Sequence, residues 1–313
     1  MSADRSDLAA RVAAGLRAPV RDEIRAFAAY LARHYDARAV LFYGSNLRSG
    51  SLDGVLDFYV LTAGGRERGL WPRVAYHEYA HAGEEMRAKV AVMTLATFAH
   101  AATGRHVDTT IWARFVQPVA LAWTDGEDAR DAVRGAIGDA VITAATVAAS
   151  LGPDEGTERD YWQALFAATY RAELRVEKPG REQQILDFGA DHFDGLMIAG
   201  WTAAGIDHDR RGAILRPHMP EAMRDETRAR WHRRRRMGKP LNIVRLLRAA
   251  TTFDGGARYL AWKVHRHSGI TVPLTSFRER HPLLCAPVLV AGYWRERRRM
   301  RRAADQSSSS TRS

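Results

Sequence analysis

The sequence predicts an α+β fold, in which a small mixed sheet with flanking helices precedes a mostly helical half. Two observations support this class. Short runs rich in β-branched and aromatic residues, bounded by turn residues, are confined to residues 38–94. Stretches in which apolar residues recur every three or four positions lie on both sides of those runs. At 313 residues, 46% of them hydrophobic, the chain fits one large domain or two ordinary ones.

The first 35 residues are expected to be helical, because their apolar residues are three or four positions apart. These residues are Leu8, Val12, Leu16, Val20, Ile24, Phe27 and Leu31. The run AVLFYGS then predicts a strand that ends in a Gly-Ser turn, and VLDFYVLT predicts a second strand. The runs VAYHEYA and AKVAVMT flank HAGEEMR and predict a hairpin.

From Thr109 to about Leu151 the pattern is helical and Ala-rich, with breaks in FVQPVA and TDGED. The segment LGPDEGTERD reads as a linker, whose Thr157 and Asp160 cap the helix that follows. We therefore divide the chain into a first domain at 1–150, a helical domain at 151–275, a basic amphipathic segment at 276–304 and a disordered tail at 305–313.

The net charge of +11 is unevenly distributed. Residues 1–208 hold 22 Lys/Arg and 28 Asp/Glu, a net of −6, whereas residues 209–302 hold 24 and 7, a net of +17. This asymmetry indicates an anionic partner for the second half, either phospholipid, nucleic acid or a phosphorylated substrate. A solubilising basic surface is the alternative. No recognised nucleic-acid-binding motif accompanies the run RARWHRRRRMGK, so no nucleic-acid partner is expected.

A candidate site follows the first strand. At a tight turn, the backbone of Gly44 can approach a phosphate, and the Ser45 hydroxyl adds a donor. Twelve residues after Ser45, Asp57 stands in the apolar run VLDFYVL, where a carboxylate is costly unless it has a cation. The Mg²⁺ of a nucleotide complex would supply that cation, which predicts nucleotidyl transfer. An ordinary hairpin loop, with Asp57 capping a backbone group, is the alternative.

Further ligands are predicted on the next two strands. Alternation places Glu78 on one face of its strand, which makes it the candidate for a second metal ligand beside Asp57. Lys89 would be an expensive core lysine but a suitable triphosphate ligand. It could instead extend to solvent from a strand end. Asp53 is nearer in sequence to Asp57 but has the setting of a loop residue.

The order of four segments resembles a known family. YGS followed by LDFYVL, then AKVAVMT, TTIWARFVQPVAL and ATYRAELRVEKP, resembles the mitochondrial translocator assembly and maintenance type phosphatidate cytidylyltransferase family, in particular its bacterial members. The resemblance covers roughly residues 38–190. It implies a nucleotidyltransferase-like sheet, a winged-helix-like helical part and a C-terminal membrane-associating segment. The implied reaction transfers CMP from CTP to phosphatidate with Mg²⁺, giving CDP-diacylglycerol and pyrophosphate.

The resemblance also implies roles for individual residues. Gly44 and Ser45 would form the phosphate turn, Asp57 the metal ligand and Lys89 a contact to the nucleotide phosphates. Arg114 falls at a family arginine and is assigned to phosphate binding. A second motif, on the helical part, matches the nucleotide-binding candidates Tyr170, Glu173 and Arg175. An intrahelical Glu-Arg arrangement with Tyr170 in the core is the alternative for this motif. The sequence departs from the family at Glu78 and through its last third, which puts the acceptor in question.

The end of the chain predicts peripheral attachment to a membrane. LLCAPVLVAGYW is too short to span a bilayer and runs directly into RERRRMRR. Apolar insertion beside a polybasic stretch is the pattern of peripheral binding to an anionic surface, although a buried helix with a solvated tail is the alternative. A single cysteine and the lack of an export signal favour the cytoplasm, at the inner face of the membrane.

Three functions are therefore weighed. The first is a Mg²⁺-dependent phosphatidate cytidylyltransferase. The second keeps the nucleotidyl chemistry and changes the acceptor to another lipid phosphate or a small-molecule phosphate. The third is a non-catalytic nucleotidyltransferase fold that serves as a binding module.

Overall fold

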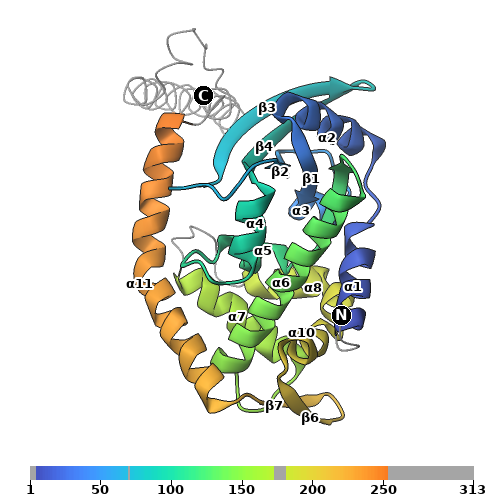
Figure 1. Cartoon of the computed structure of the whole chain (residues 1–313). Helices are drawn as coiled ribbons and strands as arrows, with labels where there is room; N and C mark the ends of the chain where they lie inside the picture. The colour runs from blue at the N-terminus through green and yellow to red at the C-terminus, as the bar shows by residue number, and fades with distance from the viewer. Residues whose placement is uncertain (1–4, 70, 173–180, 253–313) are drawn as a thin grey trace, which may run out of the picture.

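The computed structural model describes residues 5–69, 71–172 and 181–252, and its fold is α+β (Figure 1). A five-stranded sheet of order β3-β4-β2-β1-β5 lies at one end, and helices fill the other. The pair β2–β4 is parallel and the other neighbouring pairs are antiparallel, so the sheet is mixed, as predicted. The strands are β1 (Ala37–Tyr43), β2 (Leu56–Thr62), β3 (Arg73–His81), β4 (Glu84–Thr94) and β5 (Val119–Thr124).

The helices divide between the sheet and the opposite end of the molecule. Those within the first 151 residues are α1 (Ser6–Leu16), α2 (Asp22–Tyr35), α3 (Ser45–Ser49), α4 (Leu95–Ala102), α5 (Thr110–Phe115) and α6 (Glu127–Leu151). Those that follow are α7 (Glu158–Ala172), α8 (Arg181–Phe188), α9 (Ala190–Phe193), α10 (Leu196–Ala204) and α11 (Glu221–Thr252).

The prediction of one helix over the first 35 residues is wrong, because the helix is broken around Pro19. The apolar stripe continues across the break, but its two parts pack in different places. Val12 and Leu16 of α1 belong to the core among the helices, whereas Phe27 and Leu31 of α2 cover one face of the sheet. A proline has no backbone N–H and disfavours helix in the residue before it, which explains the break.

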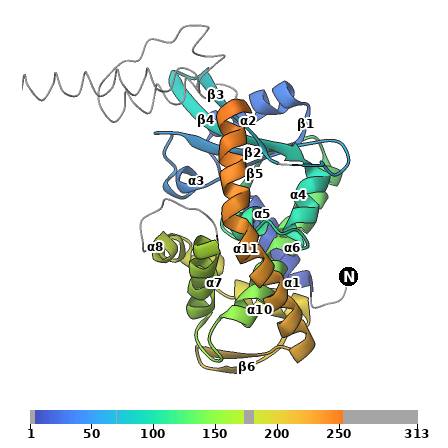
Figure 2. The same cartoon turned by 90° about the vertical axis from the view of Figure 1, so that its left-hand side faces the viewer.

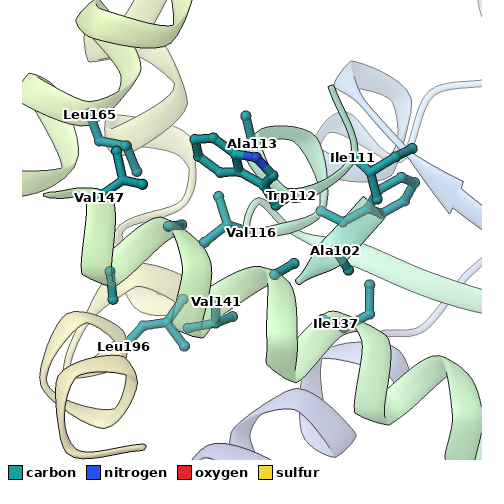
Figure 3. Close-up of a cluster of buried hydrophobic side chains, with 14 of the residues drawn as sticks. Ala102, Ile111, Trp112, Ala113, Val116, Ile137, Val141, Val147, Leu165 and Leu196 are labelled. Atoms are coloured by element: carbon teal, nitrogen blue, oxygen red, sulfur yellow. The ribbon is translucent and has the colours of Figure 1, made fainter. Parts of the chain in front are cut away.

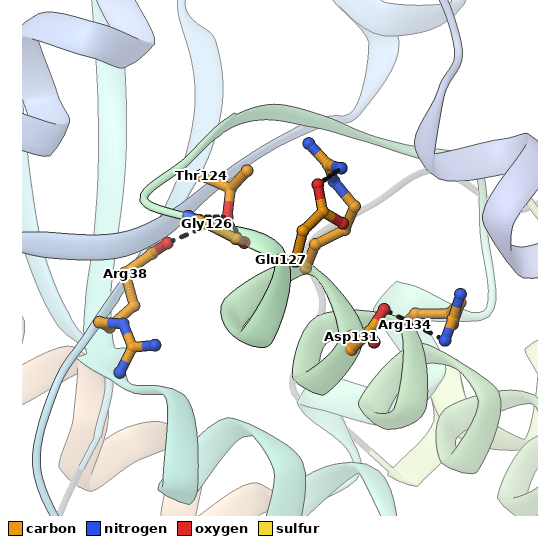
Figure 4. Close-up of polar contacts among 7 residues, drawn as sticks. Arg38, Thr124, Gly126, Glu127, Asp131 and Arg134 are labelled. Carbon is orange, nitrogen blue, oxygen red and sulfur yellow. Dashed lines mark hydrogen bonds and ion pairs between the residues drawn. The ribbon is translucent and has the colours of Figure 1, made fainter.

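Strand β5 was also missed, because its residues were assigned to an Ala-rich helical stretch. Tertiary pairing decides their conformation: β5 lies antiparallel to β1 at the sheet edge. The turn after β5 is tied to β1, since the N–H of Asp125 donates to the carbonyl of Arg38 at 3.0 Å. Figure 4 shows Thr124 and Gly126 in this turn, beside Arg38, where α6 begins.

Helix α6 is the centre of the molecule. It packs against β1 and β5 of the sheet and against α1, α4, α5, α7, α10 and α11. Its Ile137 and Val141 lie in a continuous apolar cluster with Trp112 of α5 and Leu196 of α10 (Figure 3). By length and composition α6 could cross a bilayer, but 56% of that window is buried inside the protein, as in a core helix. Because this core continues past residue 151, the predicted boundary at 150/151 separates two parts with a shared core.

Two local predictions are confirmed. Strands β3 and β4 form the predicted hairpin, with Ala82 and Gly83 at positive φ in its two-residue turn. Thr157 and Asp160 form the predicted cap of α7: the N–H of Thr157 donates to Asp160 Oδ2 at 2.8 Å, and the N–H of Asp160 donates to Thr157 Oγ1 at 3.2 Å.

The described part of the basic half differs in two ways from its prediction. A short hairpin, β6 (Asp207–Arg211) and β7 (Ile214–His218), interrupts the helices. The basic run and the apolar-basic helix after it are one helix, α11, which runs from this hairpin to the sheet (Figures 1 and 2). The segments at 276–304 and 305–313 lie outside the described residues.

The basic run of α11 does not form one uniform surface. Arg233, Arg235 and Arg236 are exposed, but Arg234 is buried. Its guanidinium donates to the carbonyl of Gly104 and lies 5.6 Å from the ring centroid of Trp112. Burial lowers the pKa of Arg234 to about 10. This arginine therefore serves to attach α11 to the α4–α5 connection.

Candidate active site at one end of the sheet

The Gly-Ser turn and the Asp57 carboxylate meet where β1 ends and β2 begins. Tyr43, the last residue of β1, pairs with Asp57 in the antiparallel register. Gly44 follows with φ of +90°, a conformation that favours glycine, and leads into α3. A Cβ at Gly44 would stand 2.9 Å from Asp57 Oδ2. The backbone of the turn therefore comes into contact with the carboxylate, and only glycine leaves room for both.

The connection between β1 and β2 is held by a buried amide. Asn46 Nδ2 donates to the carbonyl oxygens of Ser51 and Asp53, at 3.0 and 2.8 Å. The Asp53 side chain is exposed in this loop, as expected from the sequence. Because Asn46 lies near the start of this connection and bonds two carbonyl groups in its later part, it restrains the position of Gly44 relative to Asp57.

The charges of three cations act on the Asp57 carboxylate. Lys89 of β4 is its direct partner in the parallel register. Burial raises the pKa of Asp57, while the charges of Lys89, Arg114 and Arg48 act to lower it. The cost of placing a carboxylate in an apolar strand is thus partly offset by protein cations. One carboxylate among three cations leaves an excess of positive charge, which suits a polyanionic ligand.

Arg114 reaches this group from α5 across aromatic rings. Its Nη1 donates to the hydroxyl of Tyr59 at 3.4 Å, and its guanidinium carbon lies 5.5 Å from the ring centroid of Tyr43. Burial raises the pKa of Tyr43, with the Asp57 charge acting in the same direction. Tyr59 also packs edge-on against Phe115, with centroids 5.0 Å apart. These contacts hold Arg114 on the same face of the sheet as Asp57.

The structure does not bring Glu78 to Asp57. Strand β4 lies between their strands, and Glu78 pairs with Arg87, not with Lys89, in the β3–β4 register. Its carboxylate is exposed, accepts from Tyr76 at 3.1 Å and lies 3.6 Å from Arg87. Among the described residues no group of three or more His, Cys, Asp and Glu could hold a metal. Any metal here would depend on Asp57 together with ligand oxygens.

The second predicted motif is only partly described. Tyr170 lies on α7, half-buried, and packs against the helical core cluster. Its role in nucleotide binding stays a prediction. Glu173 and Arg175 lie outside the described residues.

Sequence reasoning missed Arg48, Tyr43 and Tyr59. Arg48 could have been found, because it is a cation only three residues after Ser45, in the short segment that follows Gly44. The tyrosines carried a weaker signal, since aromatic residues in strands usually belong to a core. Their contacts with Arg114 depend on where α5 packs against the sheet, and no local sequence pattern predicts that position.

Comparison with protein-family models found no match for this chain, and neither did a search of curated proteins.

Proposed function

We propose that this protein is a Mg²⁺-dependent nucleotidyltransferase that transfers CMP from CTP to phosphatidate. One observation carries the proposal: the Gly44 backbone lies against the Asp57 carboxylate, with cationic side chains around it. The resemblance to the phosphatidate cytidylyltransferase family supplies the base and the acceptor. The finer description of the fold, a nucleotidyltransferase-like sheet with a winged-helix-like helical part, belongs to the same proposal. The mixed sheet and the β6–β7 hairpin among the helices support it.

The residues present fit a magnesium ion. Mg²⁺ is usually bound by one or two carboxylates together with substrate phosphates and water, so the single Asp57 carboxylate is sufficient on the protein side. When bound, Mg²⁺ supplies charge neutralisation for the triphosphate. Lys89 and Arg114 would bind phosphate oxygens, and the Gly44-Ser45 turn would admit the phosphates close to the backbone.

The reaction needs little acid–base chemistry from the protein. A phosphate oxygen of phosphatidate attacks the α-phosphorus of CTP and forms the new P–O bond. The bond from the α-phosphorus to the oxygen bridging to the β-phosphate breaks, and pyrophosphate leaves with that electron pair. The acceptor oxygen is already ionised at neutral pH, so positioning and charge stabilisation by Lys89 and Arg114 are the contributions required.

The deciding experiment incubates purified full-length protein with α-labelled CTP, Mg²⁺ and a panel of phosphate acceptors, with ATP as the comparison nucleotide. Label transferred from CTP to phosphatidate, with pyrophosphate released in equal amount, is the expected result. Transfer to a different acceptor would favour the second function and keep the nucleotidyl chemistry. Absence of both transfer and Mg²⁺-CTP stabilisation in a thermal melt would leave only the non-catalytic binding module.

A further inference from the structure

A cavity of about 590 Å³ lies beside the candidate site, between α1, α6 and the helices α8 to α10. This size is within the range of about 300–1,000 Å³ that is typical of ligand sites. Most of its lining is apolar and comes from both halves of the chain, including Leu16, Ile137, Val141 and Leu196. Folded cores rarely keep apolar voids much larger than a water molecule. The cavity therefore has the properties of a binding site for a hydrocarbon group.

Part of the cavity lining comes from the helix that follows the Gly-Ser turn. Leu47 and Arg48 of α3 line the cavity, together with Phe115 and Pro118 at the end of α5. A smaller neighbouring hollow of about 150 Å³ is lined by Ser45, Arg48 and Phe188, among others. Arg48 is thus common to both spaces, and its charge also acts on Asp57. This arginine therefore links the apolar cavity to the charges that act on Asp57.

Two other polar residues of the lining, Arg11 and His192, have contacts within the protein. Arg11 donates to Asp7 and to the carbonyl of Asp194. His192 lies 2.8 Å from the carbonyl of Val116. The lining holds two arginines, Arg11 and Arg48, and Arg48 is the one whose charge acts on Asp57.

Phe188 marks the entrance. It lines both spaces, and 73% of its surface is exposed, the highest value among the large hydrophobic residues described. An exposed phenylalanine is unfavourable in water, but at the mouth of an apolar cavity it provides a surface along which a chain can enter.

We propose that this cavity binds one hydrocarbon chain of the acceptor, and that Arg48 binds the phosphate attached to that chain beside Asp57. This inference rests on the proposed function, which supplies the reaction of the acceptor phosphate with CTP. It adds that the acceptor is partly withdrawn from its membrane into the protein. The ligand class is an amphiphile with one phosphate group and an extended apolar chain.

Two glycines provide a matched test of the chain site. Gly15 lines the cavity, and a Cβ added there meets nothing within 4 Å; Gly135 lies on the exposed side of α6, where a Cβ also meets nothing. Gly15→Trp should fill part of the cavity, while Gly135→Trp places the same side chain in solvent. Arg48→Gln removes the proposed phosphate contact.

The measurement is calorimetric titration of the full chain with dodecyl phosphate below its micelle concentration, with dodecanol and inorganic phosphate as separate arms. Dodecyl phosphate should bind more tightly than either part alone. Gly15→Trp should weaken its binding about tenfold or more, and Gly135→Trp should leave it within about twofold. Arg48→Gln should weaken the binding of dodecyl phosphate and leave the binding of dodecanol unchanged.

Equal affinities of Gly15→Trp and Gly135→Trp for dodecyl phosphate would overturn the chain site, as would affinity for dodecyl phosphate no greater than for inorganic phosphate. Should Gly15→Trp not fold, Gly15→Leu provides the same test with a smaller side chain. Mg²⁺-CTP binding, measured on wild type and on the two glycine variants, separates the two proposals. If wild type does not bind Mg²⁺-CTP, the proposed transferase function is contradicted. If Gly15→Trp binds both Mg²⁺-CTP and dodecyl phosphate as Gly135→Trp does, only the proposed chain site in the cavity is contradicted.

Discussion

The two faces of the sheet are built from alternate residues of the same strands, yet they differ in character. On the face covered by α2, Phe58 and Val60 of β2 pack with Phe27 and Leu31 in a closed apolar cluster. On the other face, β2 presents Asp57 and Tyr59 toward α5, and one end of that face is polar. Since strand residues alternate, one seven-residue strand serves both purposes. We therefore propose that the α2 face contributes stability and that one end of the other face binds the ligand.

The largest effect is expected on the α2 face. Phe27 has no exposed surface, and its ring lies 5.4 Å from that of Phe58 and 5.1 Å from that of Tyr79. Phe27→Ala should lower the free energy of unfolding by about 3–5 kcal/mol, measured by urea denaturation. The folded fraction should bind Mg²⁺-CTP as wild type does. A variant that keeps its stability but loses CTP binding would contradict the division between the faces.

The next effect concerns Asp57. Asp57→Asn should lower nucleotidyl transfer by about 100-fold or more, because it removes the metal carboxylate while keeping the shape of the side chain. The free energy of unfolding at pH 7.5 should stay the same or rise. Burial raises the pKa of Asp57, so folding disfavours its charged form, and the stability cost is present above that pKa and disappears as the pH falls below it.

Asp53→Asn is the control for this substitution. It changes an exposed loop carboxylate four residues earlier and should leave transfer and stability unchanged. Comparable transfer by Asp57→Asn and wild type would exclude the proposed site.

A smaller effect should follow at the turn. Gly44→Ala places a Cβ 2.9 Å from Asp57 Oδ2 and should weaken Mg²⁺-CTP binding about tenfold, measured by the ligand-induced rise in Tm. Gly50→Ala is the matched control, because Gly50 also has positive φ, +67°, but its Cβ would meet nothing within 4 Å. Both variants lose stability from the backbone conformation. For Gly50→Ala the loss is about 1–2 kcal/mol, because Gly50 is left-handed. For Gly44→Ala it is about 1–3 kcal/mol, because φ of +90° with ψ of −160° is a region adopted almost only by glycine. Equal CTP binding by the two would show that the approach to Asp57 is unimportant.

The smallest effect concerns the pH dependence of the free energy of unfolding, through His192. Burial lowers the pKa of His192 below its usual 6.5, against the raising effect of its hydrogen bond to the Val116 carbonyl. The unfolded chain therefore binds more protons, so the stability contributed by this residue is complete above pH 6.5 and declines as the pH falls toward the folded-state pKa. His192→Gln, which retains a donor, should show a smaller loss of unfolding free energy between pH 7.5 and 5.5. An identical loss in both proteins would exclude this origin.

Local chemistry accounts for the parts of the fold that could be predicted. The β3–β4 hairpin needs a two-residue turn between alternating runs, and the cap of α7 needs Thr157 and Asp160 three residues apart. The Gly44-Ser45 turn and the strand that contains Asp57 were recognisable for the same reason. Each of these features depends on residues that are close in sequence, so composition and spacing are sufficient.

Other features depend on contacts between distant residues. The run VALAWT is a strand because β1 provides its hydrogen-bonding partner, and periodicity alone assigned it to helix. The arginines Arg48 and Arg234 carry no local signal that distinguishes their roles. One acts on Asp57, and the other is buried against Gly104, more than a hundred residues away in sequence.

The sequence by itself determined the α+β class, the turn at Gly44 and the carboxylate in the following strand, because short-range sterics and side-chain alternation govern them. Only the tertiary structure decided which cations meet Asp57, how α1 and α2 divide between two cores, and that a cavity opens beside the turn. Those outcomes depend on how helices pack against the sheet, and packing free energy is a property of the whole chain.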